Sequence, residues 1–393
     1  MSETIVVVGM ARTPIGGLQG DLAAWSAPEL GAITIRAALQ QSKLDAYAVD
    51  ETIMGCVLPA GLGQAPARQA SIGGGIPTSC ACTTVNKMCG SGMKAVMMGM
   101  DAIKAGSAAI VAAGGMESMS NSPYIVPKAR SGLRLGHGEL LDHMFVDGLE
   151  DAYDKGQLMG SFAEACVDKY QFSREALDAF AIESLTRARS AIDNGRFKDE
   201  IVAVSMTNQS GEVTITTDEQ PGKANIEKIS KLNPAFKTNG SITPANSSSI
   251  SDGAAALIIM SESEAEQRGL TPIARLLAQS VHAQKPAWFT IAPIGAVQKV
   301  LAKVGWGSKQ VDLYEINEAF AVVTMTAMQD LGLPHDIVNV NGGACALGHP
   351  VGASGARIMV TLISALKDRG LKRGIASLCI GGGEATAVAL ELM

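Results

Sequence analysis

The sequence predicts an α/β fold made of two similar halves, with a further segment inserted between them. Three observations carry this prediction: apolar runs alternate with Ala-rich stretches, four short segments recur in the same order, and a polar stretch separates the copies. The 393 residues are 47% hydrophobic and 18% charged, which excludes a disordered chain. This length corresponds to two domains or to one large composite.

The first half is expected to contain three strands that are buried on both faces, because their apolar runs do not alternate with polar residues. These strands are TIVVVGM, ETIMGCVL and SAAIVAAGG. Two Ala-rich helices are expected between them. The first spans Pro28–Gln41, with proline in its first turn, and the second spans Ser91–Ala105.

The second half repeats this alternation of strand and helix. Its expected strands are DLYEIN, DIVNVNG and IASLCIGGG, and its expected helices are Val297–Val304, Ala319–Leu331 and Ser354–Asp368. Alternation of this kind predicts α/β layers with mostly parallel sheets.

Four matched pairs of segments support the internal repeat. They are APELGA (27–32) with APIGA (292–296), Val49-Asp50 with Val311-Asp312, Ser91-Gly92 with Ser354-Gly355, and Gly114–Glu117 with Gly381–Glu384. Their common order and similar gaps favour two structurally equivalent halves. The alternative is that Gly- and Ala-rich αβ units resemble one another without sharing a structure.

Residues 119–249 differ from both halves and are interpreted as an inserted lid. The stretch is more polar and contains a strong amphipathic helix, Ser173–Asn194, capped by Ser173 and closed by Gly195. We therefore expect an N-terminal half of residues 1–118 and 250–270, this inserted domain, and a C-terminal half of residues 271–393.

Charge and cysteine content exclude several classes of protein. The net charge is −6 with no block of basic residues, so a nucleic-acid partner is not expected. No apolar stretch approaches the roughly 20 residues of a membrane-spanning helix, and the start carries no basic leader, so we expect a cytoplasmic protein. Seven irregularly spaced cysteines favour neither a disulfide framework nor a metal site.

Cys89 is the first candidate for chemistry. In VNKMCGSGMKA it precedes an Ala- and Met-rich helix and is followed by glycines that allow a substrate to approach closely. The positive end of the helix dipole favours the thiolate, which is the nucleophilic form. The alternative is an ordinary buried cysteine.

Three residues of the second half are further candidates. His349 lies in a Gly-rich loop before a helix, where imidazole can serve as a base or an oxyanion donor, and Cys379 ends a buried strand before three glycines. Asn317 lies between a strand and a helix, where it either caps the helix or holds a water. Structural roles for all three are the alternatives. Because ligands bind beyond the carboxyl ends of strands, Cys89 and these residues are expected to meet in one cleft, which indicates Cys/His covalent catalysis with a second thiol.

The sequence strongly resembles the thiolase family at these positions. The motifs that carry the resemblance are ARTPIGG, VNKMCGSGMKA, GGMESMSN, NEAFA, NGGACALGHPVGASGAR, CIGGG and the stretch from DEQPGKAN to SDGAAA. The resemblance runs from Ile5 to the C-terminus. It implies a five-layered αβαβα fold of two similar halves with an inserted loop domain, and an assembly of dimers or, as we expect here, a homotetramer.

The resemblance also implies a role for each candidate residue. Cys89 would be the acylated nucleophile, and Cys379 the acid/base that moves the proton at the α-carbon. His349, with a water held by Asn317, would form one oxyanion hole. The N–H groups of Cys89 and Gly381 would form the other. No metal or redox cofactor is implied, because coenzyme A thioesters are themselves the substrates.

We expect acetyl-CoA C-acetyltransferase activity, with longer-chain 3-ketoacyl-CoA thiolysis as the alternative. The family's substrate-binding positions match at Met159, Phe236, Ser248, Ala319 and Phe320. Three positions depart from the usual pattern: Leu158 replaces a histidine, Phe289 a methionine, and Gly222 an arginine that meets the nucleotide. Two rival hypotheses are a decarboxylating β-ketoacyl synthase, which would not need Cys379, and a non-catalytic acyl-CoA-binding protein.

Overall fold

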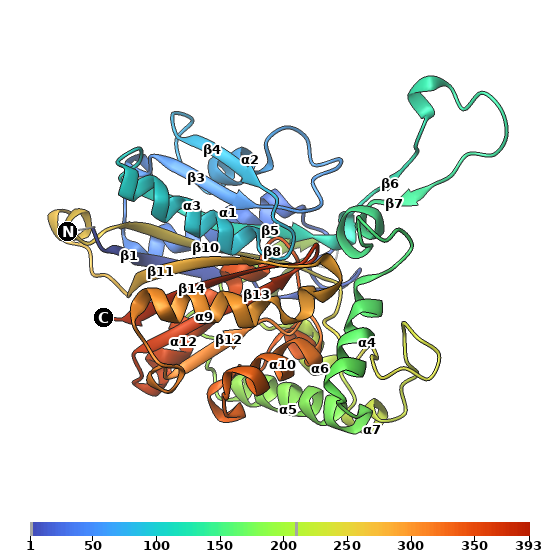
Figure 1. Ribbon diagram of the computed structural model, residues 1–393. Coiled ribbons are helices and arrows are strands. Elements are labelled where there is room, and N and C mark those ends of the chain that lie inside the picture. Colours follow the sequence, from blue (N-terminus) through green and yellow to red (C-terminus); the bar gives the residue numbers. More distant parts are fainter. Residues whose placement is uncertain (1–2, 209–210) are drawn as a thin grey trace.

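In the computed structural model, which describes residues 3–208 and 211–393, ten strands form one mixed sheet (Figure 1). The strands of the first half lie in the order β4, β3, β5, β10, β1, and those of the second half in the order β11, β14, β13, β12. Three residue pairs between β1 and β11 join the two halves. The bounds are β1 (Ile5–Arg12), β2 (Gly16–Gly17), β3 (Glu51–Gly55), β4 (Ala81–Val85), β5 (Ile110–Ser118), β10 (Ser251–Ser261), β11 (Ala274–Ala283), β12 (Leu313–Ile316), β13 (Arg373–Ile380) and β14 (Glu384–Leu392).

The strand pairings confirm the internal repeat. In the first half β3 pairs parallel with β5, β5 antiparallel with β10, and β10 antiparallel with β1. The second half reproduces this series with β12, β13, β14 and β11. The repeated Val-Asp pairs directly precede β3 and β12, and the repeated Ser-Gly pairs open α3 and α12.

Three details of the predicted fold are wrong. Among the described strands only β3–β4, β3–β5 and β12–β13 are parallel pairs, because β13 returns into β14 through a short turn rather than through a crossover helix. DIVNVNG forms a 3₁₀ turn with one bridge to Tyr314 instead of a strand. In the first half Met54 of β3 pairs with Gly114, and in the second half the equivalent Ile316 of β12 pairs with Ser377. Gly114 therefore corresponds to Ser377, and the sequence match of Gly114 to Gly381 is shifted by four residues.

Helices on both sides of the two half-sheets create five layers. Helices α3 and α12 pack against each other and against both half-sheets, so they form the central layer. Helices α1 and α2 cover the outer face of the first half, and α9 and α10 cover that of the second. Their bounds are α1 (Ala27–Ser42), α2 (Pro66–Gly73), α3 (Ser91–Ala105), α9 (Ala292–Val304), α10 (Ala321–Leu331) and α12 (Ser354–Arg369), with short α8 (Glu262–Gln267) and α11 (Ala344–Leu347).

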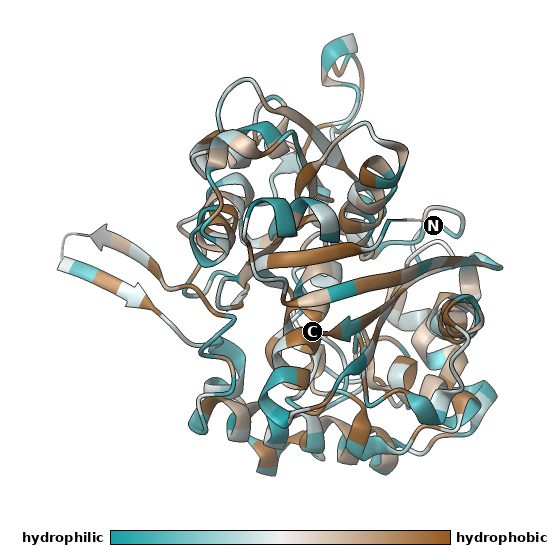
Figure 2. Cartoon of the chain, turned by 90° about the vertical axis from the view of Figure 1, so that its left-hand side faces the viewer, coloured by the Kyte–Doolittle hydropathy of each residue, from teal (hydrophilic) through white to brown (hydrophobic). Residues whose placement is uncertain are grey.

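The buried strands explain why the apolar runs of the sequence do not alternate. Side chains of Ile5 and Val7 in β1 join the core around α3 and α12, whereas Val6 and Val8 join the core under α1. Figure 2 shows these hydrophobic strands at the centre, with hydrophilic residues toward the outer helices and loops. Within the described ranges no helix has both the length and the apolarity to cross a membrane.

The segment between β5 and β10 holds helices packed beside the second half and an arm that projects from the body (Figure 1). The long predicted helix is α5, with Ser173 Oγ accepting a hydrogen bond from the Ala176 N–H at 3.2 Å. The arm begins with the pair β6–β7 and carries exposed Leu135 and Leu140. The bounds are β6 (Tyr124–Ile125), β7 (Leu141–Asp142), α4 (Met159–Tyr170), α5 (Arg174–Asp193), β8 (Val204–Asn208), β9 (Gly211–Ile215), α6 (Glu219–Lys223) and α7 (Ile226–Ile229).

Candidate active site

A tight turn between β4 and α3 presents Cys89. Met88 adopts a left-handed backbone with φ 47°, and its carbonyl accepts a hydrogen bond from Ser91 Oγ at 2.6 Å. Ser91 Oγ in turn accepts from the Lys87 N–H at 2.8 Å, which closes the turn. A Cβ at position 90 would overlap the Ile380 side chain at the end of β13, so this turn packs tightly against that strand end. The turn thus places the first-half thiol against a strand end of the second half.

The backbone N–H groups of Gly381 and of Cys89 itself lie close enough to the Cys89 sulfur to favour its thiolate. Burial raises the pKa of the thiol to about 11, although both N–H groups act in the opposite direction. The expectation that the helix dipole makes this group a thiolate is therefore wrong, since burial outweighs the two N–H groups that favour the thiolate. A base is needed to ionise Cys89.

His349 is a neutral imidazole held by the start of α12. Its Nδ1 lies 2.5 Å from Ser354 Oγ, and Ser354 Oγ donates its own hydrogen to the Pro350 carbonyl at 2.9 Å. Nδ1 therefore carries the ring proton, which leaves the lone pair of Nε2 free. Burial, reinforced by the charge of Arg357, lowers the pKa of His349 to about 3. Nε2 has no hydrogen-bond partner among the described residues, so its lone pair is open to a proton, although the low pKa makes the imidazole a weak base at rest.

Cys379 lies at the end of β13 and is fully buried. Burial and the neighbouring Cys89 raise the pKa of its thiol well above the usual range. Three residues separate β13 from β14, and positive φ values at Gly382 and Gly383 form the turn that leaves the Gly381 N–H facing Cys89. Two sulfurs from opposite halves thus share one buried environment.

Asn317 directly follows β12. Its backbone N–H donates to the Ser377 carbonyl at 3.0 Å, which fixes it beside β13. Its Oδ1 accepts a hydrogen bond from Arg357 Nη2 at 3.5 Å, while Nδ2 has no partner among the described residues. The side chain lies free to hold a further acceptor rather than capping α10, which begins at Ala321.

The five expected substrate-binding residues lie around Cys379. Met159, Phe236, Ala319 and Phe320 share one hydrophobic cluster with it, and Ser248 donates from both N and Oγ to the Ala319 carbonyl at 3.0 Å. The rings of Phe236 and Phe320 meet edge to face, with centroids 6.1 Å apart.

The three unusual positions have different surroundings. Phe289 is buried in this cluster and contacts Phe162 edge-on at 6.5 Å. Leu158 lies directly before α4 and next to Met159. Gly222 is itself exposed in α6, and nothing stands within 4 Å of where its Cβ would be. Phe289 therefore lies in the cluster that holds Cys379, whereas Gly222 offers no side chain to a ligand.

Sequence reasoning missed three buried residues that hold these loops. Glu117 accepts hydrogen bonds from the N–H groups of Val57, Leu58 and Gly352, so it ties the His349 loop to the first half. Ser354 and Arg357 contact His349 and Asn317 as described above. Glu117 lies in the repeated GGME run, which could have drawn attention to it. Ser354 and Arg357 follow His349 by five and eight residues, and this closeness in sequence was the signal that they could contact it.

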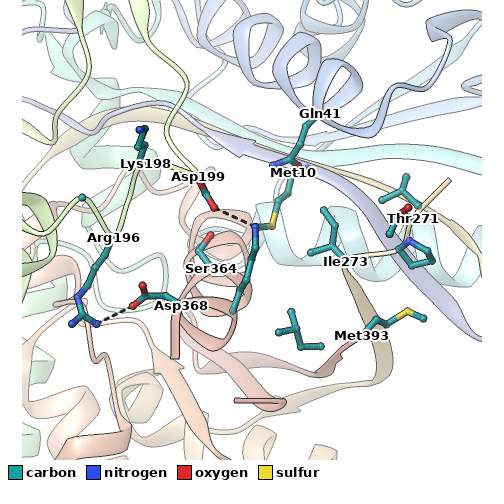
Figure 3. Close-up of a pocket in the computed structure, with 15 residues that line it drawn as sticks. Met10, Gln41, Arg196, Lys198, Asp199, Thr271, Ile273, Ser364, Asp368 and Met393 are labelled. Atoms are coloured by element: carbon teal, nitrogen blue, oxygen red, sulfur yellow. Dashed lines mark hydrogen bonds and ion pairs between the residues drawn. The ribbon is translucent and has the colours of Figure 1, made fainter. Parts of the chain in front are cut away.

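A cavity of about 600 Å³ lies at the other end of α12 (Figure 3). It is lined by Met10, Ile273, Ser364 and ion-paired side chains such as Asp368, and by none of the sequence-predicted site residues. The described residues contain no group of three or more His, Cys, Asp or Glu side chains placed to hold a metal ion.

Five layers in two similar halves, with two neighbouring thiols where the halves meet, define a class of α/β acyltransferases. The thiolase N-terminal domain profile matches residues 5–263, and the thiolase C-terminal domain profile matches residues 270–392. The chain belongs to the thiolase family.

Relatives of known name match over the whole chain. An acetyl-CoA acetyltransferase of Pseudomonas aeruginosa is 47% identical over 99% of both chains. Acetyl-CoA acetyltransferase 2 of Arabidopsis thaliana is 49% identical over 99% of this chain and 97% of its own.

Two solved structures share the fold. The acetyl-CoA acetyltransferase of Bacillus anthracis superposes with a TM-score of 0.97 at 39% identity, over 100% of this chain and 99% of its own. The Acat5 thiolase of Ascaris suum, solved in complex with coenzyme A, has a TM-score of 0.94 at 43% identity over 100% of both chains. The expected five-layered thiolase fold is confirmed.

Proposed function

We propose that the protein is an acetyl-CoA C-acetyltransferase. It condenses two acetyl-CoA molecules reversibly into acetoacetyl-CoA and coenzyme A through an acyl-cysteine intermediate. The observation that carries the proposal is the packing of the Cys89 turn against the strand end that bears Cys379, where a Cβ at Gly90 would overlap the Ile380 side chain. The names of the full-length relatives support the same activity.

Acylation begins with proton transfer from Cys89 to Nε2 of His349, which is neutral and unpartnered among the described residues. The thiolate attacks the thioester carbonyl, and the developing oxyanion meets the N–H groups of Cys89 and Gly381. Such donors are each worth roughly 3–4 kcal/mol in the transition state. The coenzyme A thiolate leaves with the proton of Cys379. The acyl-enzyme now holds a Cys379 thiolate and an imidazolium.

Condensation uses the charges that acylation created. Because burial raises the pKa of Cys379, its thiolate is a strong base toward the α-proton of the second acetyl-CoA. The enolate oxygen meets the Nε2–H of protonated His349 and a water held by Asn317. The enolate carbon then attacks the acyl carbonyl, and the departing Cys89 thiolate recovers its proton from His349. The proton taken by Cys379 restores its thiol, so both thiols and the imidazole return to their starting states.

The acyl pocket favours short chains. Phe236, Phe320 and Phe289 bring three aromatic rings close to Cys379, which leaves little room for a long acyl group. Met159 lies next to Gly381, with its Sδ 3.2 Å from where a Cβ would stand. Ser248 lies beside the Ala319 carbonyl, where it can meet the pantetheine arm. We propose that coenzyme A thioesters are the only small molecules that the reaction requires.

Longer-chain thiolysis is the second candidate within the family. The observation that favours it is Leu158, which stands where small-acyl thiolases carry a histidine and so removes a polar contact near the thioester. A decarboxylating synthase would not need Cys379, whose placement beside Cys89 argues against that reaction.

Labelled acetyl-CoA tests the function. The wild type should acquire one acetyl group, located on Cys89 by mass spectrometry, and Cys89→Ala should acquire none. Cys379→Ala should still be acetylated but should not form acetoacetyl-CoA. Equal loss of both half-reactions in Cys379→Ala would contradict the division of roles. A non-catalytic binder would acquire no label at all.

A thiolysis series on 3-oxoacyl-CoA substrates from four carbons upward tests the chain length. We expect kcat/KM to be highest for acetoacetyl-CoA and to fall with each added pair of carbons. A maximum at longer chains would favour the second candidate. Product that requires malonyl thioesters and loses CO₂ would identify a synthase instead.

We also propose three properties of the whole protein. The chain assembles as a homotetramer, since the projecting arm exposes Tyr124, Leu135 and Leu140, with Leu135 98% exposed. It acts in the cytoplasm, which suits its free thiols. Residues 1–118 with 250–270, residues 119–249 and residues 271–393 form its three domains. Light scattering would test the first, since a monomer would contradict it.

A further inference from the structure

Two arginines are fully buried in the interior, and they differ in how well they are paired. Arg12 donates to Glu200 at 2.5 Å, to Asp218 at 2.7 and 2.9 Å, and to a backbone carbonyl at 3.2 Å. Arg357 has one carboxylate nearby, Glu315, with Nη1 3.8 Å from Oε2. Its Nε and Nη1 make no hydrogen bond to any described residue. Each nitrogen of the Arg12 guanidinium thus has a hydrogen-bond partner, as expected of a structural ion pair, whereas two nitrogens of Arg357 have none among the described residues.

The hydrogen bond that Arg357 does make goes to the candidate active site. Its Nη2 donates to Oδ1 of Asn317 at 3.5 Å. Arg357 also lies near His349, because Ser354, which contacts His349 Nδ1 at 2.5 Å, precedes Arg357 by three residues on the same face of α12. Atoms of all three residues that lack a partner among the described residues therefore gather in one buried region: Asn317 Nδ2, His349 Nε2, and Arg357 Nε and Nη1.

We propose that Arg357 is a positioning residue for enolate formation, acting through Asn317; this inference rests on the proposed function. A guanidinium has donors only, so it faces the acceptor end of the Asn317 carboxamide. A reversed carboxamide would set its N–H₂ group against guanidinium donors in a region of low dielectric, where such opposition is costly. Arg357 thus keeps the Asn317 Nδ2 donor turned away from itself, toward the enolate side of the cleft.

We expect folding to depend less on the charge of Arg357 than on the charge of Arg12. Burial raises the pKa of Glu315 to about 8 even with Arg357 beside it. Removal of Arg357 therefore leaves a neutral acid at Glu315 rather than an unpaired buried anion. Glu200 and Asp218, by contrast, both depend on Arg12. This difference provides a matched structural control.

A double-mutant cycle with separate half-reactions tests the proposal. The variants are Arg357→Met, Asn317→Ala and the double variant. The two readouts are acetylation of Cys89 by acetyl-CoA and exchange of the acetyl-CoA α-protons with D₂O. We expect Arg357→Met to slow proton exchange and kcat by about 10²-fold, the size typical of one lost oxyanion donor, with KM within about twofold. Acetylation should not slow, because loss of the Arg357 charge raises the pKa of His349, the base in that half-reaction.

The double variant decides whether Arg357 acts through Asn317. We expect it to exchange protons no more slowly than Asn317→Ala alone, since the carboxamide is already absent. Losses that multiply, or an equal fall of acetylation and exchange in Arg357→Met, would overturn the proposal. Arg12→Lys should lower the melting temperature while exchange per folded enzyme stays unchanged.

Arg357→Lys keeps the test decisive if Arg357→Met does not fold. Lysine retains the charge but cannot form the planar fork, so we expect folded protein whose proton exchange is slowed while acetylation is not. Normal exchange in Arg357→Lys would refute the orientation argument. A wild type that never acetylates Cys89 would instead refute the proposed function, so the two failures are distinguishable.

Discussion

Replacement of Gly92 by alanine probes how the two halves bring their catalytic loops together. The N-terminal turns of α3 and α12 cross at this point, between the loops that carry Cys89 and His349. A Cβ on Gly92 would lie 2.9 Å from the Ala356 nitrogen, 3.0 Å from the Gly352 oxygen and 3.1 Å from the Ala353 oxygen. All three are backbone atoms, so no rotamer change can relieve the overlap.

The expected magnitude follows from two opposing effects. Helix propensity alone would make Gly→Ala stabilising by about 1 kcal/mol. Carbon atoms pack best about 3.5–4.0 Å apart, so α12 must withdraw by roughly half an ångström or more, and overpacking of this kind costs about 1–3 kcal/mol. We therefore expect no stabilisation, and a net loss of up to about 2 kcal/mol. A misplacement of reacting groups by about 1 Å can slow a reaction about 10²-fold. We therefore expect kcat to fall even where the Gly92→Ala enzyme remains fully folded.

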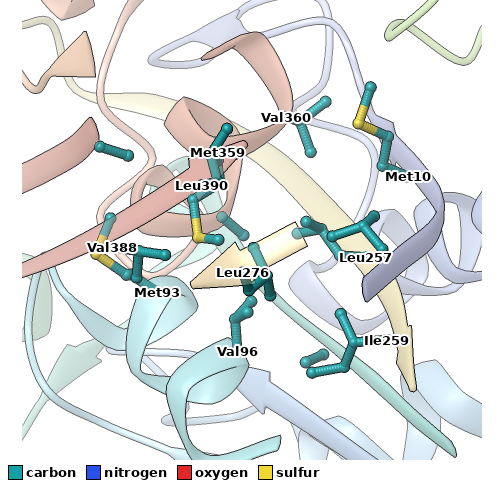
Figure 4. Close-up of a cluster of buried hydrophobic side chains, with 14 of the residues drawn as sticks. Met10, Met93, Val96, Leu257, Ile259, Leu276, Met359, Val360, Val388 and Leu390 are labelled. Carbon is teal, nitrogen blue, oxygen red and sulfur yellow. The ribbon is translucent and has the colours of Figure 1, made fainter. Parts of the chain in front are cut away.

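Gly99→Ala is the matched control, since it lies in the same helix and has the same propensity gain. Its Cβ would meet Ile259 Cδ1 at 2.9 Å and Val111 Cγ1 at 3.1 Å, and both are side-chain ends in the central core between the half-sheets (Figure 4). Those methyl groups can move, so stability should change by less than about 1 kcal/mol and kcat should not change. Urea unfolding and acetoacetyl-CoA thiolysis measure both quantities. A Gly92→Ala enzyme that is more stable than wild type and fully active would refute the reasoning.

Three other predictions concern the imidazole, the thiol and a helix cap. Ser354→Ala removes the partner of His349 Nδ1, so kcat for thiolysis should fall about five- to tenfold at unchanged melting temperature; an unaltered kcat would show that the ring needs no such anchor. Since burial raises the pKa of Cys89 to about 11, its rate of alkylation by iodoacetamide should keep rising from pH 7 to above about pH 10, whereas levelling off below about pH 8.5 would indicate an ordinary thiol. Ser173→Ala removes the cap of α5 and should lower the free energy of unfolding by about 1 kcal/mol in urea titrations, with Ser173→Asn restoring it.

Local signals in the sequence were sufficient for the elements that carry the site. Helix α3 spans the predicted residues, because a glycine turn precedes it and Gly106 closes it. The Ser-Gly pairs at 91–92 and 354–355 mark the two helix starts that pack together, which is why the repeat located the junction of the halves. Candidates from both halves then meet because parallel strands of each half end at that junction.

The direction of strand pairing and the polar contacts of the buried site could not be predicted from local sequence signals. An apolar run that is buried on both faces has the same sequence pattern in parallel and antiparallel sheets. The sequence therefore did not indicate that β10 and β14 pair antiparallel with their neighbours. The displaced Gly114 match arose because Gly-Gly occurs inside β5 and also in the turn after β13. Ser354 and Arg357 occupy a helix whose buried face looks apolar in sequence, and their partners become visible only when α12 is placed beside β12.

The raised pKa values of the thiols oppose ionisation at rest, but they make the proton transfers productive. A thiol that is ionised at rest would be a weaker nucleophile and a weaker base, because both properties fall with pKa. The buried site instead keeps Cys89 and Cys379 as thiols and His349 neutral until a thioester occupies the cleft. The thioester then supplies the developing oxyanion that the Gly381 N–H can stabilise, so charge separates only when a substrate is present to use it. Burial is therefore the property that couples ionisation to substrate binding, and substitutions that admit water should lower the thiol pKa values while slowing the reaction.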